Sequence, residues 1–186
     1  MREEIKRAIA ALRSGKLILY PTDTVWGIGC DATNYDAIRK IYELKQREEA
    51  KSMICLVSDI KMLQRYVESV PEAAYDIIKL SAKPTTIIYD KPKAVAENVI
   101  SSDNTLGIRV ASDNFCRSLV AAFKKPIVST SANISGQPTP LGFDQISEDI
   151  LKGVDYVVNL HRQKRSEKAS SIIKLTNDGQ VTVIRA

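Results

Sequence analysis

The sequence contains few of the residues on which many enzymes depend. It has one histidine, His161, and three cysteines, Cys30, Cys55 and Cys116, which lie far apart and form no CxxC pair. A zinc cage built from side chains, a Cys–His nucleophile and a Ser-His-Asp triad are therefore poorly supported. We expect the cysteines to be reduced and buried among apolar neighbours.

Long apolar runs and consensus phosphate loops are also absent from the sequence. No apolar run approaches the roughly 20 residues of a membrane span, and the sequence opens with MREE rather than an apolar signal segment. There is no GxxxxGK[ST] pattern, and the GxG of residues 27–29 alone is weak evidence for dinucleotide binding. We therefore expect a cytoplasmic protein with no membrane partner and no P-loop.

The composition that is present is that of a globular protein. With 186 residues, 44% of them hydrophobic and 26% charged, the chain can bury a sizeable core, and a single domain over residues 1–186 is the simplest organisation. The formal net charge of +5 favours an anionic partner. It does not choose among a nucleotide, RNA and a phosphorylated metabolite.

The hydrophobic pattern predicts alternating helices and strands. Ile5, Ala8, Ile9 and Leu12 recur at helical spacing, and the run KLILY that follows Gly15 is typical of a buried strand. Asn34 is placed to cap a second helix, and two alternating segments around residues 177–179 (NDG) indicate a hairpin. Further helices are predicted after Asp59 and Pro71 and at residues 114–123, and further strands at residues 53–57, 85–89, 106–110, 126–130 and 155–159. This order predicts an α/β fold with a mixed sheet.

The first polar cluster is the stretch YPTDTVWGIGCDA, residues 20–32, at the end of the first predicted strand. Thr22, Asp23 and Thr24 precede Gly27 and Gly29. A hydroxyl-and-glycine loop of this kind binds a polar ligand in some proteins and is ordinary turn chemistry in others. The pattern alone leaves both interpretations open.

The second cluster is KQREEAK, with Lys45, Arg47 and Lys51. A helix that continued through it would leave these charges on a solvated face. If the chain leaves the helix near Lys45, the cations can converge near the first loop and bind a polyphosphate or a carboxylate. The two interpretations are about equally supported.

The third cluster is STSANISG, residues 129–136, which follows a predicted strand. Strand ends are where open α/β sheets place their ligands, although hydroxyl-rich turns are also common there. Three single residues, Arg109, Ser170 and Arg185, lie in or beside predicted strands. Taken one at a time, exposure at the surface is the simpler explanation for each of them.

In combination these motifs resemble the YrdC-like family of threonylcarbamoyl-AMP synthases. The resemblance runs in order through LYPTDTVWGIGCDA, IYELKQREEAKSMICLV, TLGIRVA, PIVSTSANISGQPT and ASSIIKL, and so covers nearly the whole chain. The PTDT-x-x-G-x-G and S-x-SAN-x-SG stretches are specific together. KxR and the lone arginine would mean little without them.

The resemblance implies a YrdC-like α/β fold, with a twisted mixed sheet flanked by helices around a basic concave cavity, in the short single-domain form. It also implies a nucleotidyltransferase that makes L-threonylcarbamoyladenylate and pyrophosphate from L-threonine, bicarbonate and ATP, with Mg²⁺ accompanying the ATP. The product would serve the modification of tRNA position 37 through downstream tRNA threonylcarbamoyl-transferase proteins. On this view the loop at residues 22–24 holds threonine, and the glycines after it let the backbone approach the ligands.

The resemblance also implies roles for individual residues. The catalytic cations, which would neutralise the ATP phosphates and the carbamate, are Lys45, Arg47 and Lys51. The residues implied for threonine binding are Thr24, Arg109 (for its carboxylate), Ser129 and Ser170. Those implied for ATP binding are Lys45, Arg47, Lys51, Ser131, Asn133, Ser135 and Arg185.

Two alternatives remain open at this point. A double-stranded RNA-binding or ribosome-associated module could use the same basic cavity, with tRNA or duplex RNA as partner and HRQKRSEK (residues 161–168) contributing contacts. A carbamoyl-transfer domain for another acceptor would share the fold and much of the site. The clustering of hydroxyl groups at strand ends favours an enzyme, because binding an RNA backbone does not require a small closed pocket.

Overall fold

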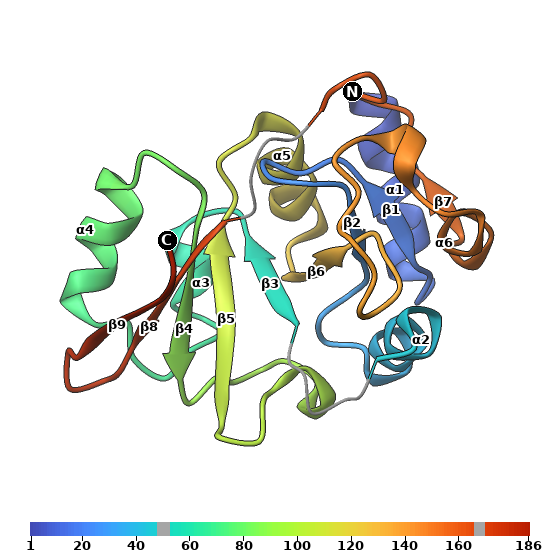
Figure 1. Ribbon diagram of the computed structural model, residues 1–186. Helices are drawn as coiled ribbons and strands as arrows, with labels where there is room; N and C mark the ends of the chain where they lie inside the picture. The colour runs from blue at the N-terminus through green and yellow to red at the C-terminus, as the bar shows by residue number, and fades with distance from the viewer. Residues whose placement is uncertain (48–52, 166–169) are drawn as a thin grey trace.

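One mixed sheet organises the molecule. The computed structural model describes residues 1–47, 53–165 and 170–186. In these residues nine strands form a sheet in the order β7-β1-β2-β6-β3-β5-β4-β8-β9 (Figure 1). The strands are β1 (Ile18–Tyr20), β2 (Gly27–Gly29), β3 (Ile54–Val57), β4 (Thr85–Asp90), β5 (Thr105–Val110), β6 (Ile127–Ser131), β7 (Tyr156–Val157), β8 (Ser171–Leu175) and β9 (Val181–Arg185). The predicted α/β fold with a mixed sheet is confirmed.

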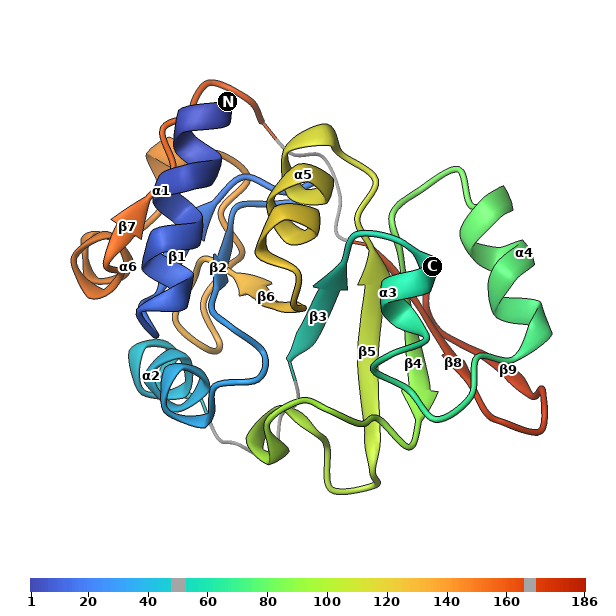
Figure 2. The same cartoon turned by 180° about the vertical axis from the view of Figure 1, so that it is seen from behind.

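Helices cover the sheet mainly on one face. They are α1 (Arg2–Arg13), α2 (Tyr35–Lys45), α3 (Ile60–Leu63), α4 (Glu72–Leu80), α5 (Asn114–Phe123) and α6 (Glu148–Gly153), with 3₁₀ turns at Glu97–Val99 and Phe143–Gln145. In Figure 2, α1, α5 and α3 stand in front of the sheet, and α4 lies at its side, toward β8 and β9. The helices α2 and α6 lie toward the β7 end. This arrangement leaves the middle of the opposite face available for a site.

Side-chain caps explain where several helices begin. Asn34 accepts a hydrogen bond from the Ala37 backbone N–H at 3.0 Å, and Asp59 and Asp113 cap α3 and α5 in the same way. The end of α2 is equally defined, because Gln46 adopts a left-handed conformation with φ 49° and ψ 47°. The chain therefore leaves the helix directly after Lys45.

The short strand β2 differs from the sequence prediction, which treated this segment as a loop. Gly27–Gly29 pairs antiparallel with β1 on one side and with β6 on the other. A Cβ on Gly29 would lie 2.6 Å from the Val128 carbonyl oxygen and 2.7 Å from a ring carbon of Tyr20. The expectation that both glycines admit ligands is therefore wrong for Gly29, which has no side chain because neighbouring strands occupy that space.

The C-terminal hairpin confirms the prediction made from its turn residues. β8 and β9 are antiparallel, and Gly179 between them has φ +88°, in the region that favours glycine. β8 also pairs in parallel with β4, so the hairpin extends the sheet. β9 is the edge strand on that side.

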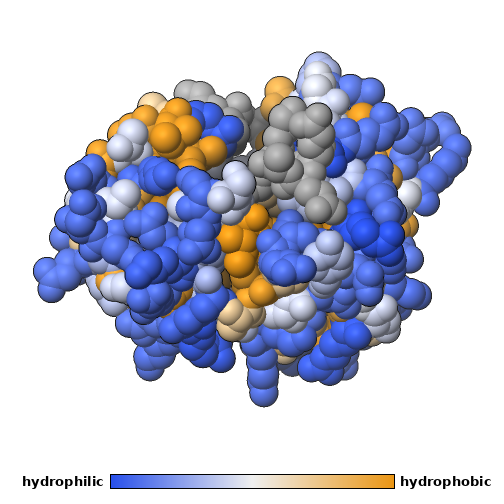
Figure 3. Space-filling model, turned by 90° about the horizontal axis from the view of Figure 1, so that it is seen from below, coloured by the Kyte–Doolittle hydropathy of each residue, from blue (hydrophilic) through white to orange (hydrophobic). Residues whose placement is uncertain are grey.

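The surface is mostly hydrophilic where Figure 3 views it, with hydrophobic atoms gathered in a hollow near the centre of that face. The exposed large hydrophobic residues of the described chain are Met1, Tyr35, Leu80, Leu141, Val181, Val183 and Ile184. Across the described ranges, every helix is too short or too polar to cross a membrane. The three cysteines are free and buried, as predicted.

Candidate active site

A cavity of about 250 Å³ opens on the face of the sheet that the helices leave free. It is lined by Thr22, Thr24, Val25, Gly27, Arg47, Met53, Ile54, Arg109, Ser129, Thr130, Ser131, Thr139, Ser170, Ile172 and Arg185. Six strands, β2, β3, β5, β6, β8 and β9, contribute to this lining. The cavity thus brings together all three polar clusters of the sequence, although they are far apart along the chain.

The loop between β1 and β2 is fixed by its own hydroxyl groups. Thr22 Oγ1 donates to the Val25 carbonyl at 2.7 Å and accepts the Thr24 backbone N–H at 3.1 Å. The Thr22 and Thr24 hydroxyls are 3.0 Å apart. Thr22 therefore shapes the turn, and the turn places Thr24 in the cavity wall.

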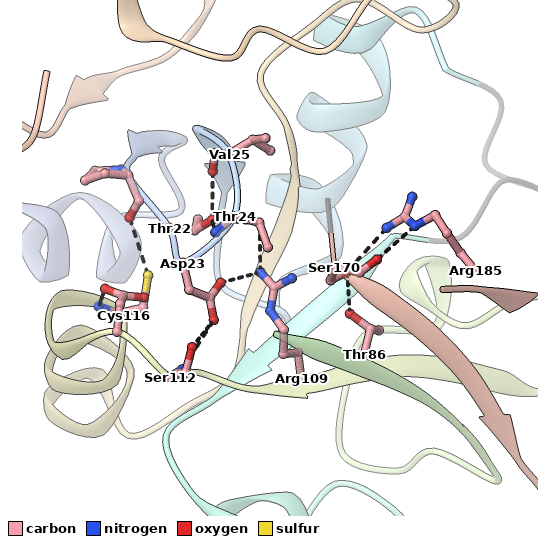
Figure 4. A network of polar contacts seen from close by, with 12 residues as sticks. Thr22, Asp23, Thr24, Val25, Thr86, Arg109, Ser112, Cys116, Ser170 and Arg185 are labelled. Carbon is pink, nitrogen blue, oxygen red and sulfur yellow. Dashed lines mark hydrogen bonds and ion pairs between the residues drawn. The ribbon is translucent and has the colours of Figure 1, made fainter. Parts of the chain in front are cut away.

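Arg109 projects from β5 and is buried. Its exposed fraction is 3%, so the expectation of surface exposure for this residue is wrong. One terminal nitrogen, Nη2, lies 3.0 Å from Asp23 Oδ1 and 3.5 Å from Thr24 Oγ1 (Figure 4). Because a buried guanidinium needs a counter-charge, Asp23 explains how Arg109 can occupy a strand interior.

Ser112 binds the Asp23 carboxylate at the oxygen that Arg109 does not contact. Its hydroxyl donates to Asp23 Oδ2 at 2.7 Å, and its backbone N–H reaches the same oxygen at 3.3 Å. Asp23 therefore uses one oxygen for Arg109 and the other for the segment between β5 and α5. None of the sequence motifs indicated a role for Ser112.

Ser170 and Arg185 form the opposite wall. Ser170 is buried, again contrary to the expected exposure, and its hydroxyl lies 3.1 Å from Thr86 Oγ1 on β4. Arg185 donates from Nε to the Ser170 carbonyl at 2.8 Å and from Nη2 to the Ser170 hydroxyl at 3.3 Å (Figure 4). Thr86, which is fully buried, was also missed by the sequence analysis.

Lys45 is placed behind the cavity wall rather than among the lining residues. It is 1% exposed, and its ammonium donates to the carbonyls of Ser131 and Asn133 at 2.5 Å each. Burial, followed by repulsion from Arg47, lowers the pKa of Lys45 to about 8. Lys45 therefore ties the end of α2 to the loop after β6.

Arg47 lies in the cavity wall because α2 ends before it. Burial lowers the pKa of its guanidinium from the usual value. The helix does end near Lys45, as the expected convergence of the cations required, but of the two described cations only Arg47 reaches the cavity lining. The third predicted cation, Lys51, falls outside the described residues.

Two other predicted residues support the loop after β6 without lining the cavity. Asn133 donates from Nδ2 to the carbonyls of Ile134 and Gln137, at 3.1 and 2.7 Å. The backbone N–H of Ser135 donates to the Lys45 carbonyl at 2.8 Å. Ser129 and Ser131, by contrast, line the cavity from β6, together with Thr130 between them.

The cavity offers cations and hydroxyl groups as its chemistry. Burial raises the pKa of Cys55 to about 12 and raises that of Cys30 and Cys116, so these thiols are poor nucleophiles. In the described part of the chain, no three His, Cys, Asp or Glu side chains gather as a metal site. The arrangement suits binding and charge neutralisation of a small anionic or zwitterionic ligand.

Comparison with known proteins identifies the relatives of this chain. A family model described as "Telomere recombination", which groups Sua5, YciO and YrdC, matches residues 10–186. A relative from Methanocaldococcus jannaschii, provisionally named a threonylcarbamoyl-AMP synthase, is 34% identical over 97% of this chain and 86% of its own length. The threonylcarbamoyl-AMP synthase of Pyrococcus abyssi is 29% identical over 94% of this chain, which spans 52% of that longer protein.

Solved structures agree with the sequence comparisons. P. abyssi Sua5 complexed with L-threonine is 26% identical and superimposes with a TM-score of 0.82, over 92% of this chain and 50% of that one. E. coli YciO is 26% identical with a TM-score of 0.86, over 100% of this chain and 89% of its own. Since the family model matches nearly the whole sequence and the fold matches as well, the chain belongs to the Sua5/YciO/YrdC family.

Proposed function

We propose that this protein is a threonylcarbamoyl-AMP synthase that acts in the cytoplasm. It forms L-threonylcarbamoyladenylate and pyrophosphate from L-threonine, bicarbonate and ATP. The relatives that carry this name support the proposal. The names do not favour the alternative of a double-stranded RNA-binding module.

The observation that carries the proposal is the buried Arg109 beside hydroxyl groups in a small cavity. An arginine with five N–H donors in a fixed fork suits a carboxylate, and the hydroxyls of Thr24, Ser129 and Ser170 surround it with further donors and acceptors. The volume of about 250 Å³ is below the range typical of drug-sized ligands and suits an amino acid. We assign the threonine carboxylate to Arg109.

Because a volume of about 250 Å³ does not hold a whole nucleotide beside threonine, we assign only the phosphates of ATP to the other side of this cavity, with the nucleoside outside it. Arg47 and Arg185 supply positive charge for phosphates, and Ser131 supplies a hydroxyl, while Lys45 and Asn133 hold the loop that presents Ser131. The described lining contains no carboxylate, so Mg²⁺ would arrive bound to the phosphates of ATP rather than in a site built by the protein. Ser135 would act at the edge of this region, and Lys51, outside the described residues, stays a predicted ATP-binding residue.

The proposed reaction needs positioning more than acid–base groups. The threonine amine takes up carbon dioxide, supplied by bicarbonate, to give a carbamate. A carbamate oxygen attacks the α-phosphorus of ATP, and the bond to pyrophosphate breaks. Such phosphorus chemistry is catalysed mainly by alignment and neutralisation of charge, which the arginines and hydroxyls of this cavity provide without a histidine.

The product is a mixed anhydride that carries an activated threonylcarbamoyl group. We propose that downstream tRNA threonylcarbamoyl-transferase proteins consume it to modify adenosine at tRNA position 37. Direct binding of tRNA or duplex RNA by this chain is not required for that role. The partners of the first step are ATP, L-threonine and bicarbonate.

The test is pyrophosphate release from ATP, with threonine and bicarbonate omitted in turn. Both should be required, and serine should be a poorer substrate because it lacks a methyl group whose burial contributes about 1 kcal/mol. Arg109→Ala, assayed in parallel, should raise the threonine requirement sharply and leave any duplex-RNA binding nearly unchanged. Equal pyrophosphate release without threonine would contradict the proposal.

A further inference from the structure

Asp23 lies between Arg109 and Ser112, and it has no role in the substrate assignments above. Its side chain is 5% exposed, and it is not itself among the residues that line the cavity. One carboxylate oxygen is 3.0 Å from Arg109 Nη2, and the other accepts two hydrogen bonds from Ser112. Figure 4 shows the three residues in a row, with Ser112 farthest from Ser170.

This row restricts how the guanidinium can move. A carboxylate held at both oxygens cannot rotate freely, and the Arg109 nitrogen that it binds is fixed with it. Thr24 Oγ1, at 3.5 Å from the same nitrogen, lies on the cavity side of that contact. The guanidinium is thereby held at Nη2 by Asp23 and Thr24, while Arg109 remains part of the cavity lining and so can meet a ligand.

The charge balance of the Arg109–Asp23 pair also indicates that Arg109 is oriented before a ligand binds. Arg109 and Asp23 together are neutral, so the buried arginine does not need an anion to be stable in the folded protein. A ligand carboxylate is then recognised by oriented N–H donors, and the ligand does not have to neutralise an unpaired charge. Pre-orientation of this kind reduces the free energy spent on ordering the site when the ligand binds.

We propose that Asp23 is a positioning residue that orients Arg109 for an amino-acid carboxylate, with Ser112 holding Asp23 in place. The inference rests on the proposed function, because it takes threonine as the ligand. It differs from a purely structural role, in which Asp23 would only tie the β1–β2 loop to the start of α5. The positioning role and the purely structural role can be distinguished with a ligand that lacks the carboxylate, because only the positioning role depends on that group.

The experiment measures binding by titration calorimetry of L-threonine and of L-threonine amide, which lacks the negative charge. The wild type should bind threonine more tightly than the amide. Asp23→Asn, which is nearly isosteric, should weaken threonine binding by about tenfold and change amide binding by less than about twofold. Ser112→Ala should show the same pattern with a smaller change, of about threefold.

Asp31→Asn is the matched control. Asp31 is also a buried carboxylate in an ion pair, with Lys125 at 2.7 Å, but it lies away from the cavity lining. The control should lower the melting temperature and leave the ratio of threonine to amide affinity unchanged. Melting curves for all variants establish that each is folded, and Ser112→Ala carries the test if Asp23→Asn does not fold.

The outcomes distinguish the inference from the function. If the wild type binds no threonine, both are overturned. If the wild type binds threonine and the folded variants keep its full preference for threonine over the amide, only the positioning role is overturned. An equal loss of that preference in Asp31→Asn would also overturn it, because the effect would then be general destabilisation.

Discussion

Two buried carboxylates from the same stretch of sequence, Asp23 and Asp31, hold cations in different ways. Asp31 binds Lys125 at 2.7 Å and accepts two further hydrogen bonds from Thr33, and its lysine is 47% exposed. Asp23 binds Arg109, whose side chain is 3% exposed and whose other donors include a buried Nε without a hydrogen-bond partner. The first pair is locally satisfied, whereas the second keeps two buried atoms without a hydrogen bond, Asp23 Oδ1 and Arg109 Nε, and its arginine lines the cavity.

The difference between the Asp31–Lys125 and Asp23–Arg109 pairs shows that a buried ion pair can serve stability alone or can also prepare a cation for binding. Around Asp31, all the donors come from its own turn and from one lysine that water also reaches. Around Asp23, the pairing fixes an arginine at the edge of a cavity. The exposed fractions of the two carboxylates do not separate the sites, whereas the position of each cation does, because Arg109 lines the cavity and Lys125 does not.

The largest expected effect comes from removing each cation. Arg109→Met leaves Asp23 buried and uncompensated, and should lower the free energy of unfolding by about 3–5 kcal/mol. Lys125→Met should cost about 1 kcal/mol, because the lysine is half exposed and Thr33 still binds Asp31. Urea unfolding of both variants measures the difference. Equal losses would remove the distinction between the pairs.

The next prediction concerns Arg47, a cation that lines the cavity and belongs to neither of these two ion pairs. Arg47→Ala should reduce kcat/KM for ATP by about ten- to a hundredfold, because charge-assisted bonds to phosphate or carbamate are lost. Arg47→Lys should recover part of this, since an ammonium cannot reproduce the guanidinium fork. Steady-state kinetics with ATP varied gives the result, and a melting curve checks folding.

Arg39→Ala is the control for that variant. Arg39 lies on the exposed face of α2, where it pairs with Glu43 at 3.0 Å. Its loss should leave the kinetics unchanged. A folded Arg47→Ala protein with wild-type kinetics would remove this cation from the proposed site.

Lys45 extends the comparison to a buried cation that bonds backbone carbonyls. Its pKa is about 8 in the folded protein, whereas the value in an unfolded chain is about 10.4. Between these values the unfolded chain binds more protons, so the stability contribution of Lys45 should rise as the pH increases, by roughly 3 kcal/mol over the whole interval. Below pH 8 both states are largely protonated and this contribution levels off.

The measurement is the difference in unfolding free energy between the wild type and Lys45→Met across this pH range. The other titrating groups largely cancel in this difference because both proteins contain them, and the methionine at position 45 does not titrate. The difference should shift in favour of the wild type as the pH rises. A difference that stays flat from pH 7.5 to about 10 would show that the pKa of Lys45 is not lowered.

The smallest effect is expected from a single hydroxyl beside Asp31. Thr33→Val removes an O–H that donates to Asp31 at 2.7 Å but keeps the backbone N–H bond at 2.8 Å. The variant should lose about 1 kcal/mol of stability and use threonine as the wild type does. Unfolding curves and threonine KM values would check this. A raised KM would connect Asp31 to the cavity.

Much of the fold could be predicted from local signals. Asn34, Asp59 and Asp113 cap helices where their side chains predict it, and the NDG turn forms the predicted hairpin. The strand at Gly27–Gly29 could not be predicted in the same way, because glycine has little intrinsic preference for strands. Its place in the sheet depends on the close approach of Tyr20 and Val128, which is a tertiary property.

The candidate site divides along a similar line. Motif resemblance named seven residues that line the cavity, among them Thr24, Arg109 and Ser170. It gave no role to Ser112 or Thr86, because the contacts of Ser112 with Asp23 and of Thr86 with Ser170 join residues separated by 89 and 84 positions. One sequence without relatives does not reveal such pairs. For the same reason, Arg109 taken alone was wrongly expected at the surface, because its counter-charge lies on another loop.

The wall formed by Ser170 and Arg185 has a consequence for synthesis of the protein. Residues 22–131, which supply the rest of the described lining apart from Thr139, emerge from the ribosome before β8 and β9 do. Since β8 must pair with β4, far earlier in the chain, this wall can form only after residues 170–185 are released. This wall is therefore the last part of the cavity to be synthesised, and a nascent chain that lacks residues 170–185 lacks a complete cavity.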